Sequence, residues 1–170
     1  MFNTLGGPLA LGRKTGSGFQ DFNAVNSYPI TLTADTWTTV VNDGAGAYTN
    51  LTYGPVDKGV LMDATTGEID TSGLNLGDTL LVRNDFRLTP SVNNTSVQFR
   101  YRLGTGAGQY YLTNQLGILS NGAGIEYPLQ FLGYIYMGDT NTKDNPIGLE
   151  INCSAETSFT NLGIVMEALA

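Results

Sequence analysis

The residue types that carry most enzyme chemistry are scarce in this chain. Its 170 residues include no histidine and a single cysteine, Cys153. Ser–His–Asp and Cys–His arrangements use a histidine base to activate the nucleophile, so neither arrangement is available. Cys153 lies in the alternating segment 146–154, which indicates a small buried side chain. A lone cysteine also excludes an internal disulfide framework and gives no metal site by itself.

The carboxylates are spread along the chain rather than gathered into a pair. Asp43, Asp63, Asp70, Asp78 and Asp139 all fall in turn-like segments, where an aspartate caps the backbone of a turn. A glycosidase needs two carboxylates facing each other across the sugar. We therefore interpret these residues as turn and cap residues, and we predict that the protein is not an enzyme.

One acidic stretch resembles a calcium loop. Asp139, Asn141 and Glu150 occupy the first, third and twelfth positions of an EF-hand, but Lys143 takes the fifth and Asp144 replaces the glycine of the sixth. No helices are predicted on either side, so an EF-hand is rejected, while a looser calcium site at Asp139 and Asp144 stays open. GTGAG at 104–108 is followed by neither a phosphate-binding lysine nor a helix and is a turn. No metal and no cofactor are predicted.

The composition indicates an all-β protein with many turns. Hydrophobic residues make up 41% of the chain and charged residues only 14%, and Thr, Asn, Ser and Gly supply the difference. The net charge is −7 and no basic cluster is larger than Arg13-Lys14, which argues against nucleic acid as a partner. No stretch approaches the roughly 18 apolar residues of a membrane span.

Strand signals recur at short intervals from residue 28 onward, and no segment keeps a helical period over two or three turns. The expected strands are 28–33, 36–41, 79–88, 96–103, 109–113, 126–139, 146–154 and 157–169, with short pieces between residues 60 and 76. The ending Met166-Glu167-Ala168-Leu169 would suit a short helix, but Phe159, Ile164 and Val165 favour a strand. Eight to ten strands without helices predict a sandwich or a barrel. Residues 28–170 form one predicted domain, and the glycine-rich residues 1–27 are read as an extended arm.

One pair of strands allows a register to be predicted. If 79–88 and 96–103 form a hairpin around residues 90–94, Phe86 faces Phe99 and Leu88 faces Val97 on the inner side. On the outer side Asp85 then lies opposite Arg100. An apolar face and a charged face emerge together, as cross-strand pairing requires.

Two other strands are apolar on both faces. In 126–139 one face carries Leu129, Phe131, Ile135 and Met137 and the other Leu132, Tyr134 and Tyr136; in the last strand both parities are also apolar. Either both strands are central in a thick monomeric core, or their second faces lie against other copies of the chain. We favour the second explanation, because an exposed apolar face would promote aggregation. The predicted interface residues are Leu132, Tyr134, Tyr136, Ile164 and Met166.

The segments ITLTADTWTTVVNDGAGAYTN and LNLGDTLLVRNDFRLTPSVNNTSVQFRYRLG resemble the jelly-roll domains of tailed-phage virion proteins. Trp37 matches the tryptophan of an early strand in these domains, and Gly77, Asp78 and Arg83 match their Gly-Asp-x-x-x-x-Arg stretch. The plan is similar to that of the trimeric heads of tumour-necrosis-factor and complement-like proteins, so the resemblance implies an antiparallel jelly-roll (TNF-like) sandwich. It also implies a homotrimer with aromatic residues near the threefold axis, and no catalytic residues.

Such domains serve as capsid decoration (cement) proteins, as head fibres, or as receptor-binding tips of tail fibres. The short arm and the lack of a repeated fibre shaft favour decoration, so we expect a protein of the virion that binds the major capsid protein on the outer capsid surface. The predicted arm contacts are Leu5, Leu9, Leu11, Arg13, Lys14 and Phe19. A receptor- or glycan-binding fibre tip is the alternative, with Tyr48, Tyr53, Tyr110 and Tyr111 as its candidate residues.

Overall fold

The computed structural model describes residues 16–24 and 30–169. The strands in this part of the chain are β1 Gly18–Asn23, β2 Ile30–Leu32, β3 Thr38–Thr39, β4 Thr79–Pro90, β5 Thr95–Leu103, β6 Tyr110–Leu119, β7 Tyr127–Tyr136, β8 Gly148–Cys153 and β9 Thr157–Leu169. A 3-10 turn at Gly106–Gly108 and a four-residue helix, α1 Thr140–Lys143, complete the elements. Each of the eight predicted strand ranges contains a strand, though with different bounds, and 157–169 is a strand rather than a helix. The pieces predicted between residues 60 and 76 form isolated bridges only, and β1 was not predicted.

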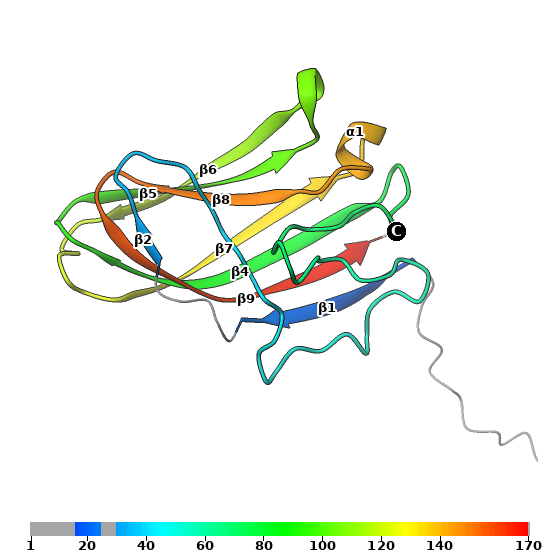
Figure 1. Ribbon diagram of the computed structural model, residues 1–170, viewed down its shortest axis with the longest axis horizontal. Coiled ribbons are helices and arrows are strands. Elements are labelled where there is room, and N and C mark those ends of the chain that lie inside the picture. The colour runs from blue at the N-terminus through cyan, green and yellow to red at the C-terminus, as the bar shows by residue number, and fades with distance from the viewer. Residues whose placement is uncertain (1–15, 25–29, 170) are drawn as a thin grey trace, which may run out of the picture.

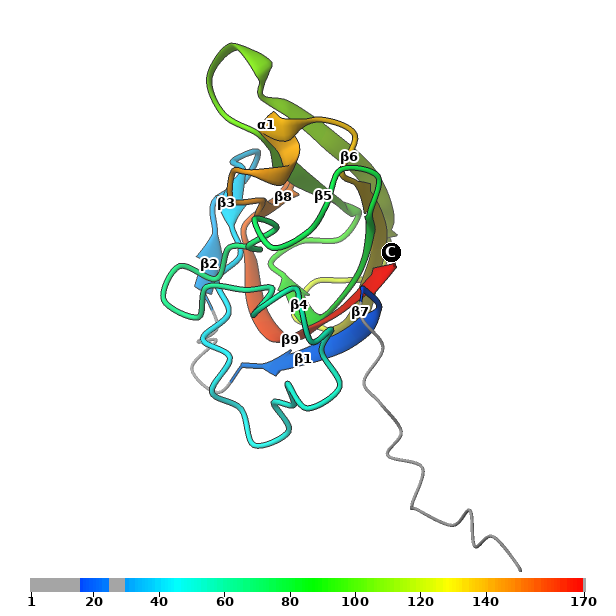
Figure 2. The ribbon, with the colours of Figure 1, turned by 90° about the vertical axis from the view of Figure 1, so that its right-hand side faces the viewer.

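The strands form two antiparallel sheets packed face to face (Figures 1 and 2). Sheet A has the order β1-β9-β4-β7, with β2 also paired to β9; sheet B has the order β3-β8-β5-β6. This architecture is an antiparallel jelly-roll sandwich, as the sequence predicts. Since neighbours in each sheet come from distant parts of the chain, long-range contacts hold the fold together.

Aromatic side chains from both sheets meet in the middle of the sandwich. Phe86 of β4 lies 4.6 Å from Phe99 of β5 between ring centroids, and Phe99 in turn stacks on Phe131 of β7 at 5.2 Å. Phe159 of β9 reaches Phe86 at 5.7 Å. Offset and tilted ring pairs at these distances add to the stabilisation that burial of the rings already provides.

The predicted hairpin of 79–88 with 96–103 is wrong. β4 pairs with β7 and β9, whereas β5 pairs with β6 and β8, so the two strands belong to different sheets. Phe86 and Phe99 do touch, but they touch across the core. Arg100 therefore pairs with Glu150 of β8 at 2.6 Å, and Asp85 pairs with Arg83 on the opposite sheet. Alternation shows which side chains point inward, but two strands of one sheet and two strands of facing sheets give the same pattern.

The last strand changes its inward parity along its length. Asp85 pairs with Gly163 but Phe86 pairs with Asn161, so Leu162 is an extra residue in β9. Before this β-bulge the odd-numbered Phe159 points into the core; after it the even-numbered Ile164 and Met166 do, and all three are at most 2% exposed. A bulge reverses the face to which the following side chains point. This reversal is why β9 looks apolar on both faces in the sequence.

Part of the predicted arm 1–27 is a strand of the sandwich. Residues 18–23 form β1, which pairs with β9 from Gly18–Ala168 to Asn23–Gly163 and is an edge strand of sheet A. Phe19 therefore belongs to the sandwich and not to a free arm. The other predicted arm residues, Leu5, Leu9, Leu11, Arg13 and Lys14, lie outside the described residues.

Candidate functional site: the outer face of sheet A

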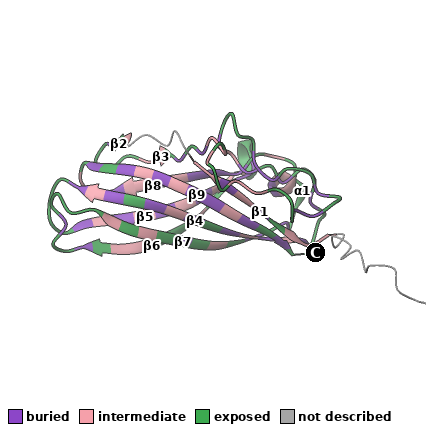
Figure 3. Ribbon diagram, turned by 90° about the horizontal axis from the view of Figure 1, so that it is seen from below, coloured by how far each residue is buried: buried purple, intermediate pink, exposed green. Residues whose placement is uncertain are grey.

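The side of sheet A that faces away from the core is apolar over half its length. Register places Leu169, Thr79 and Tyr136 in one row across the sheet and Phe19, Glu167, Leu81 and Tyr134 in the next. The third row holds Asp21, Val165, Arg83 and Leu132. Figure 3 shows the exposed stretches of β7 at the sheet edge. Large apolar side chains from four strands thus share one surface, with the charged side chains of Glu167 and Arg83 among them.

Three of the predicted interface residues lie on this surface. Leu132, Tyr134 and Tyr136 are 51%, 62% and 61% exposed, while the alternate residues Phe131 and Ile135 are buried in the core. The predicted division of this strand between two faces is therefore confirmed.

Ile164 and Met166 do not belong to this surface. Both are fully buried in the core of the single chain. The sequence-based assignment of these two residues to an interface is wrong, because the bulge at Leu162 turns them inward. Their neighbour Val165 points outward instead and lines the surface.

The apolar half contains a groove of about 250 Å³ lined by Phe19, Leu81, Arg83, Leu132, Val165 and Glu167. Sequence reasoning did not place Leu81 and Val165 on this surface. The outward direction of Leu81 could have been predicted from alternation alone, since Leu80 and Val82 beside it are core residues. The outward direction of Val165 could not, because it depends on the bulge.

The other half of the face is polar and hollow. Gly163 carries no side chain in the row of Asn23, Asp85 and Gln130, and a hollow of about 510 Å³ opens there. Arg83 Nε donates to Asp85 Oδ2 at 3.1 Å, and Gln130 Nε2 donates to Asp85 Oδ1 at 2.9 Å. Burial raises the pKa of Asp21 in this hollow; the positive charge of Arg83 opposes the shift and the negative charge of Asp85 adds to it.

A second apolar surface lies along the edge of sheet B. β6 pairs only with β5 among the described strands, and its sequence YYLTNQLGIL contains no charged residue and no proline. Ile118 is 64% exposed, and Leu112 and Leu116 pack partly against the core. Soluble proteins usually protect a free edge with charges, proline or a cover. This edge carries neither kind of protective residue.

The candidate tyrosines of the alternative reading fall into two places. Tyr48 and Tyr53 lie in the loop beside β1, and Tyr110 and Tyr111 begin β6 near α1. At the second place Gln109 Nε2 donates to Tyr111 Oη at 2.6 Å, and the Tyr110 and Thr142 hydroxyls are 3.1 Å apart. One face of the Tyr111 ring is occupied by the Arg100 guanidinium, 3.9 Å from the ring centroid, and Trp37 covers the other side of Arg100 at 4.0 Å.

The residues singled out for other chemistry have structural contacts. Asp139 caps α1, accepting from Thr142 N at 2.7 Å, and Asp144 pairs with Lys143. No group of three or more His, Cys, Asp or Glu residues in the described ranges is arranged to hold a metal ion. Burial raises the pKa of the Cys153 thiol, which disfavours the reactive thiolate. In the same part of the chain, no helix has the length and apolarity needed to cross a membrane.

Comparison with known proteins supports the fold at low sequence identity. No protein-family model matches the chain, and no curated protein matches it significantly. Among solved structures, the Eiger TNF of S. frugiperda is similar with 12% identity, a TM-score of 0.55, and coverage of 91% of this chain and 94% of that chain. The T13 viral particle of infectious bursal disease virus contains a chain with 13% identity and a TM-score of 0.51; the match covers 91% of this chain but only 31% of that one. The PRD1 vertex protein P5 also matches, at 15% identity and a TM-score of 0.44, over 91% of this chain and 72% of that chain. The sandwich is therefore a TNF-like jelly roll, a fold that it shares with a domain of a viral capsid.

Proposed function

We propose that the protein is a structural component of a virion, a homotrimer that decorates the outer surface of the capsid and stabilises it. The observation that carries this proposal is the apolar outer face of sheet A. Leu132, Tyr134 and Tyr136 lie on it side by side, each more than half exposed. The fold is compatible with a homotrimer and with a component of a virion, since a TNF and a viral particle have domains of this plan.

A second copy of the chain is the occupant that best fits this face. Removing a large apolar side chain from water contributes about 1.5–3 kcal/mol, and a half-exposed side chain gains roughly half of that. Association costs on the order of 4–15 kcal/mol, so the three predicted residues do not suffice alone. Phe19, Leu81, Val165 and Leu169 on the same face, together with the β6 edge, extend the available apolar area.

The outer face of sheet A and the edge formed by β6 and β7 are two different surfaces. A contact between two different surfaces favours a ring over a simple dimer. A face of sheet A that receives the β6–β7 edge of the next copy makes a heterologous contact, which closes into a ring when the rotation permits. The resemblance to trimeric jelly rolls sets the expected number of copies at three. In this arrangement the tyrosines of β7 lie close to the axis.

Attachment to the capsid is assigned to the residues before β1. A trimer presents three such arms on one rigid body, and a first contact raises the effective concentration of the other two. One decoration protein can thus bridge several capsid subunits. Deleting residues 1–15 is expected to abolish capsid attachment and to leave the trimer intact, because β1 and the sandwich remain complete.

Light scattering of the purified protein tests the assembly directly. The expected mass is three times the 18.1 kDa of one chain, unchanged down to micromolar concentration. A mass of one chain under these conditions would refute the trimer. Cosedimentation with shells made from the major capsid protein of the same virus tests the attachment.

A receptor- or glycan-binding tip is the second candidate function. It is favoured by the tyrosine and carboxamide side chains of Tyr110, Gln109 and Asn141, which gather at one end of the sandwich around residues 104–109 and α1. Binding to a glycan array that is lost in a Tyr110→Ala variant would support this candidate over decoration.

A further inference from the structure

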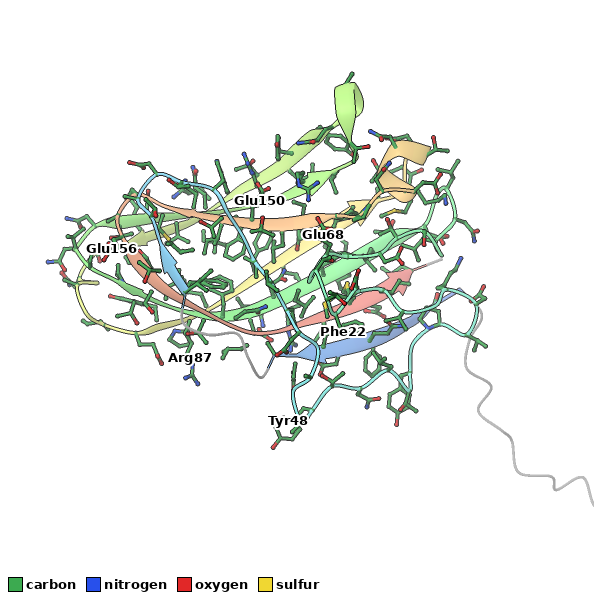
Figure 4. All side chains as sticks on the ribbon, in the orientation of Figure 1. Phe22, Tyr48, Glu68, Arg87, Glu150 and Glu156 are labelled. Carbon is green, nitrogen blue, oxygen red and sulfur yellow. The ribbon has the colours of Figure 1, made fainter. Side chains whose placement is uncertain are left out.

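The loop beside β1, residues 45–60 (the β1 loop), exposes several large apolar side chains. Tyr48 is 82% exposed, Tyr53 58%, Val56 57% and Val60 51%, and Leu51 is also exposed. Figure 4 shows Tyr48 pointing away from the body of the molecule. Single exposed apolar residues are common on protein surfaces, but several in one short segment mark an interaction site.

This β1 loop is held in a fixed position along the free edge of β1. Phe19 N donates to Tyr53 O at 3.1 Å, and Asp21 and Asn50 exchange two backbone hydrogen bonds of 2.9 Å. Gly18 admits the loop closely, since a Cβ atom there would lie 2.4 Å from Tyr53 O. A loop whose backbone is already ordered loses little entropy when its side chains bind a partner.

Both ends of the segment are also anchored. At its start Gly46 N donates to Asn23 O at 2.8 Å. Near its end Gln20 Nε2 donates to Gly59 O at 2.6 Å, and the buried Lys58 pairs with Asp78 at 2.9 Å. The exposed apolar side chains are therefore not the surface of a mobile segment. They are presented outward on a rigid backbone.

The position of the loop argues for the capsid as its partner rather than a second copy. β1 is at the opposite edge of sheet A from β7, so the loop lies away from the β6–β7 edge. Tyr53 stacks on Phe19 of the sheet A face at 5.3 Å between ring centroids, so Tyr53 is left out of the capsid contact and Tyr48, Val56 and Val60 are assigned to it. Gly16 N donates to Asp57 Oδ1 at 2.9 Å, so the first described residue lies beside this loop. Fifteen residues precede Gly16, and they include the arm assigned to the capsid.

We infer that the β1 loop is a second capsid-docking surface, in which Tyr48, Val56 and Val60 pack against apolar side chains of the capsid protein beside the point where the arm begins. This inference rests on the proposed decoration function. Fifteen residues can span at most about 50 Å, at 3.3–3.6 Å each, which is the upper limit on the reach of the arm. The loop supplies a fixed contact that orients the trimer on the shell.

The test is cosedimentation of the full-length protein with shells assembled from the major capsid protein of the same virus. The loop variant carries Tyr48→Ser, Val56→Ser and Val60→Ser. The matched control carries Val92→Ser and Ile125→Ser, which are 49% and 50% exposed in the β4–β5 and β6–β7 connections. The loop variant should bind at least tenfold more weakly, with an unchanged solution mass, and the control should bind as the unaltered protein does.

Three outcomes would overturn the inference in different ways. Equal binding of the loop variant and the control would remove the loop from the capsid contact and leave the decoration function in place. A lowered solution mass of the loop variant would assign the loop to the subunit contact. Failure of the unaltered protein to bind shells would refute the decoration function itself.

Amide hydrogen exchange of the unaltered protein, free and shell-bound, tests the docking surface without a variant. The backbone amides of residues 45–60 should gain protection from exchange when the protein is bound to shells. No gain in protection would refute the docking surface.

Discussion

Lys58 Nζ lies 2.9 Å from Asp78 Oδ2, and the two side chains are only 2% and 9% exposed. The pair joins the β1 loop to the start of β4. Asp78 was matched to the jelly-roll pattern in the sequence, but its lysine partner, 20 residues upstream, was not predicted. Asp78 Oδ2 also accepts Asn75 N at 2.7 Å, so the carboxylate organises the turn that begins β4.

Removing one member of this pair should cost far more than removing both. Lys58→Met leaves a buried carboxylate without its cation and is expected to destabilise the protein by about 3–5 kcal/mol. Adding Asp78→Asn removes the unpaired charge and keeps an acceptor for Asn75 N, so it should restore part of the loss. Urea unfolding of both variants measures the difference. Equal losses in the single and the double variant would contradict a charge-based role.

Asp21 gives the protein a predictable pH dependence. Its pKa in the folded state is raised from 3.8 because it is partly buried; Arg83 opposes this and Asp85 adds to it. The folded state thus keeps the Asp21 proton to a higher pH than the unfolded state does, so folding stability from this group is greatest below pH 3.8 and falls as the pH rises through the folded pKa. Asp21→Asn should therefore stabilise the protein at pH 7 and have no such effect at pH 3. Thermal unfolding at both values tests this, and a variant less stable at pH 7 would contradict it.

The elements show which features alternation can predict. It correctly divided β7 into an inner face with Phe131 and Ile135 and an outer face with Leu132, Tyr134 and Tyr136, because that strand is regular. Alternation predicted the wrong side-chain directions in β9, where a bulge interrupts the strand, and it could not predict which strands pair within a sheet. The β9 bulge lies beside Gly163, and an isolated glycine in a strand pattern suggests a bulge without fixing its position. The β4–β5 connection could close a hairpin or cross between sheets.

Deleting Leu162 tests the role of the bulge. With the extra residue gone, Phe159, Ile164 and Met166 fall on one parity, so a regular β9 can bury all three without a bulge. The deletion is therefore expected to leave the fold intact. Deleting Val165 instead leaves a strand that can bury Ile164 or Met166 but not both, and exposing one large side chain costs about 1.5–3 kcal/mol. Circular dichroism during thermal unfolding compares the two deletions. A melting temperature of the Leu162 deletion as low as that of the Val165 deletion would contradict the role of the bulge.

At the scale of the whole molecule, one side of the sandwich is prepared for a partner and another is not. The outer face of sheet B is crossed by charged pairs, Arg100 and Arg102 with Glu150 and Arg102 with Glu68, whose side chains are only 12–25% exposed. Their charges are satisfied within the chain. The outer face of sheet A has apolar rows at one end and the Arg83–Asp85 pair at the other. A ring of copies that meets on sheet A leaves sheet B outside.

A charge placed on the apolar rows should break the ring without unfolding the chain. In the single chain Tyr134 and Tyr136 are about 60% exposed (62% and 61%), so Tyr134→Glu with Tyr136→Glu leaves the core intact. In the ring the same carboxylates would lose water next to Glu167, and Arg83 of the same face already pairs with Asp85, so the penalty is several kcal/mol for each chain. Light scattering should show the mass of one chain, and the melting temperature should lose its dependence on concentration, since only an assembly has one. Tyr48→Glu, at an 82% exposed tyrosine of the β1 loop, is the matched control and should keep the mass of three chains. Three-chain mass in both variants would mean that sheet A does not form the contact, and one-chain mass in both would place the β1 loop within it.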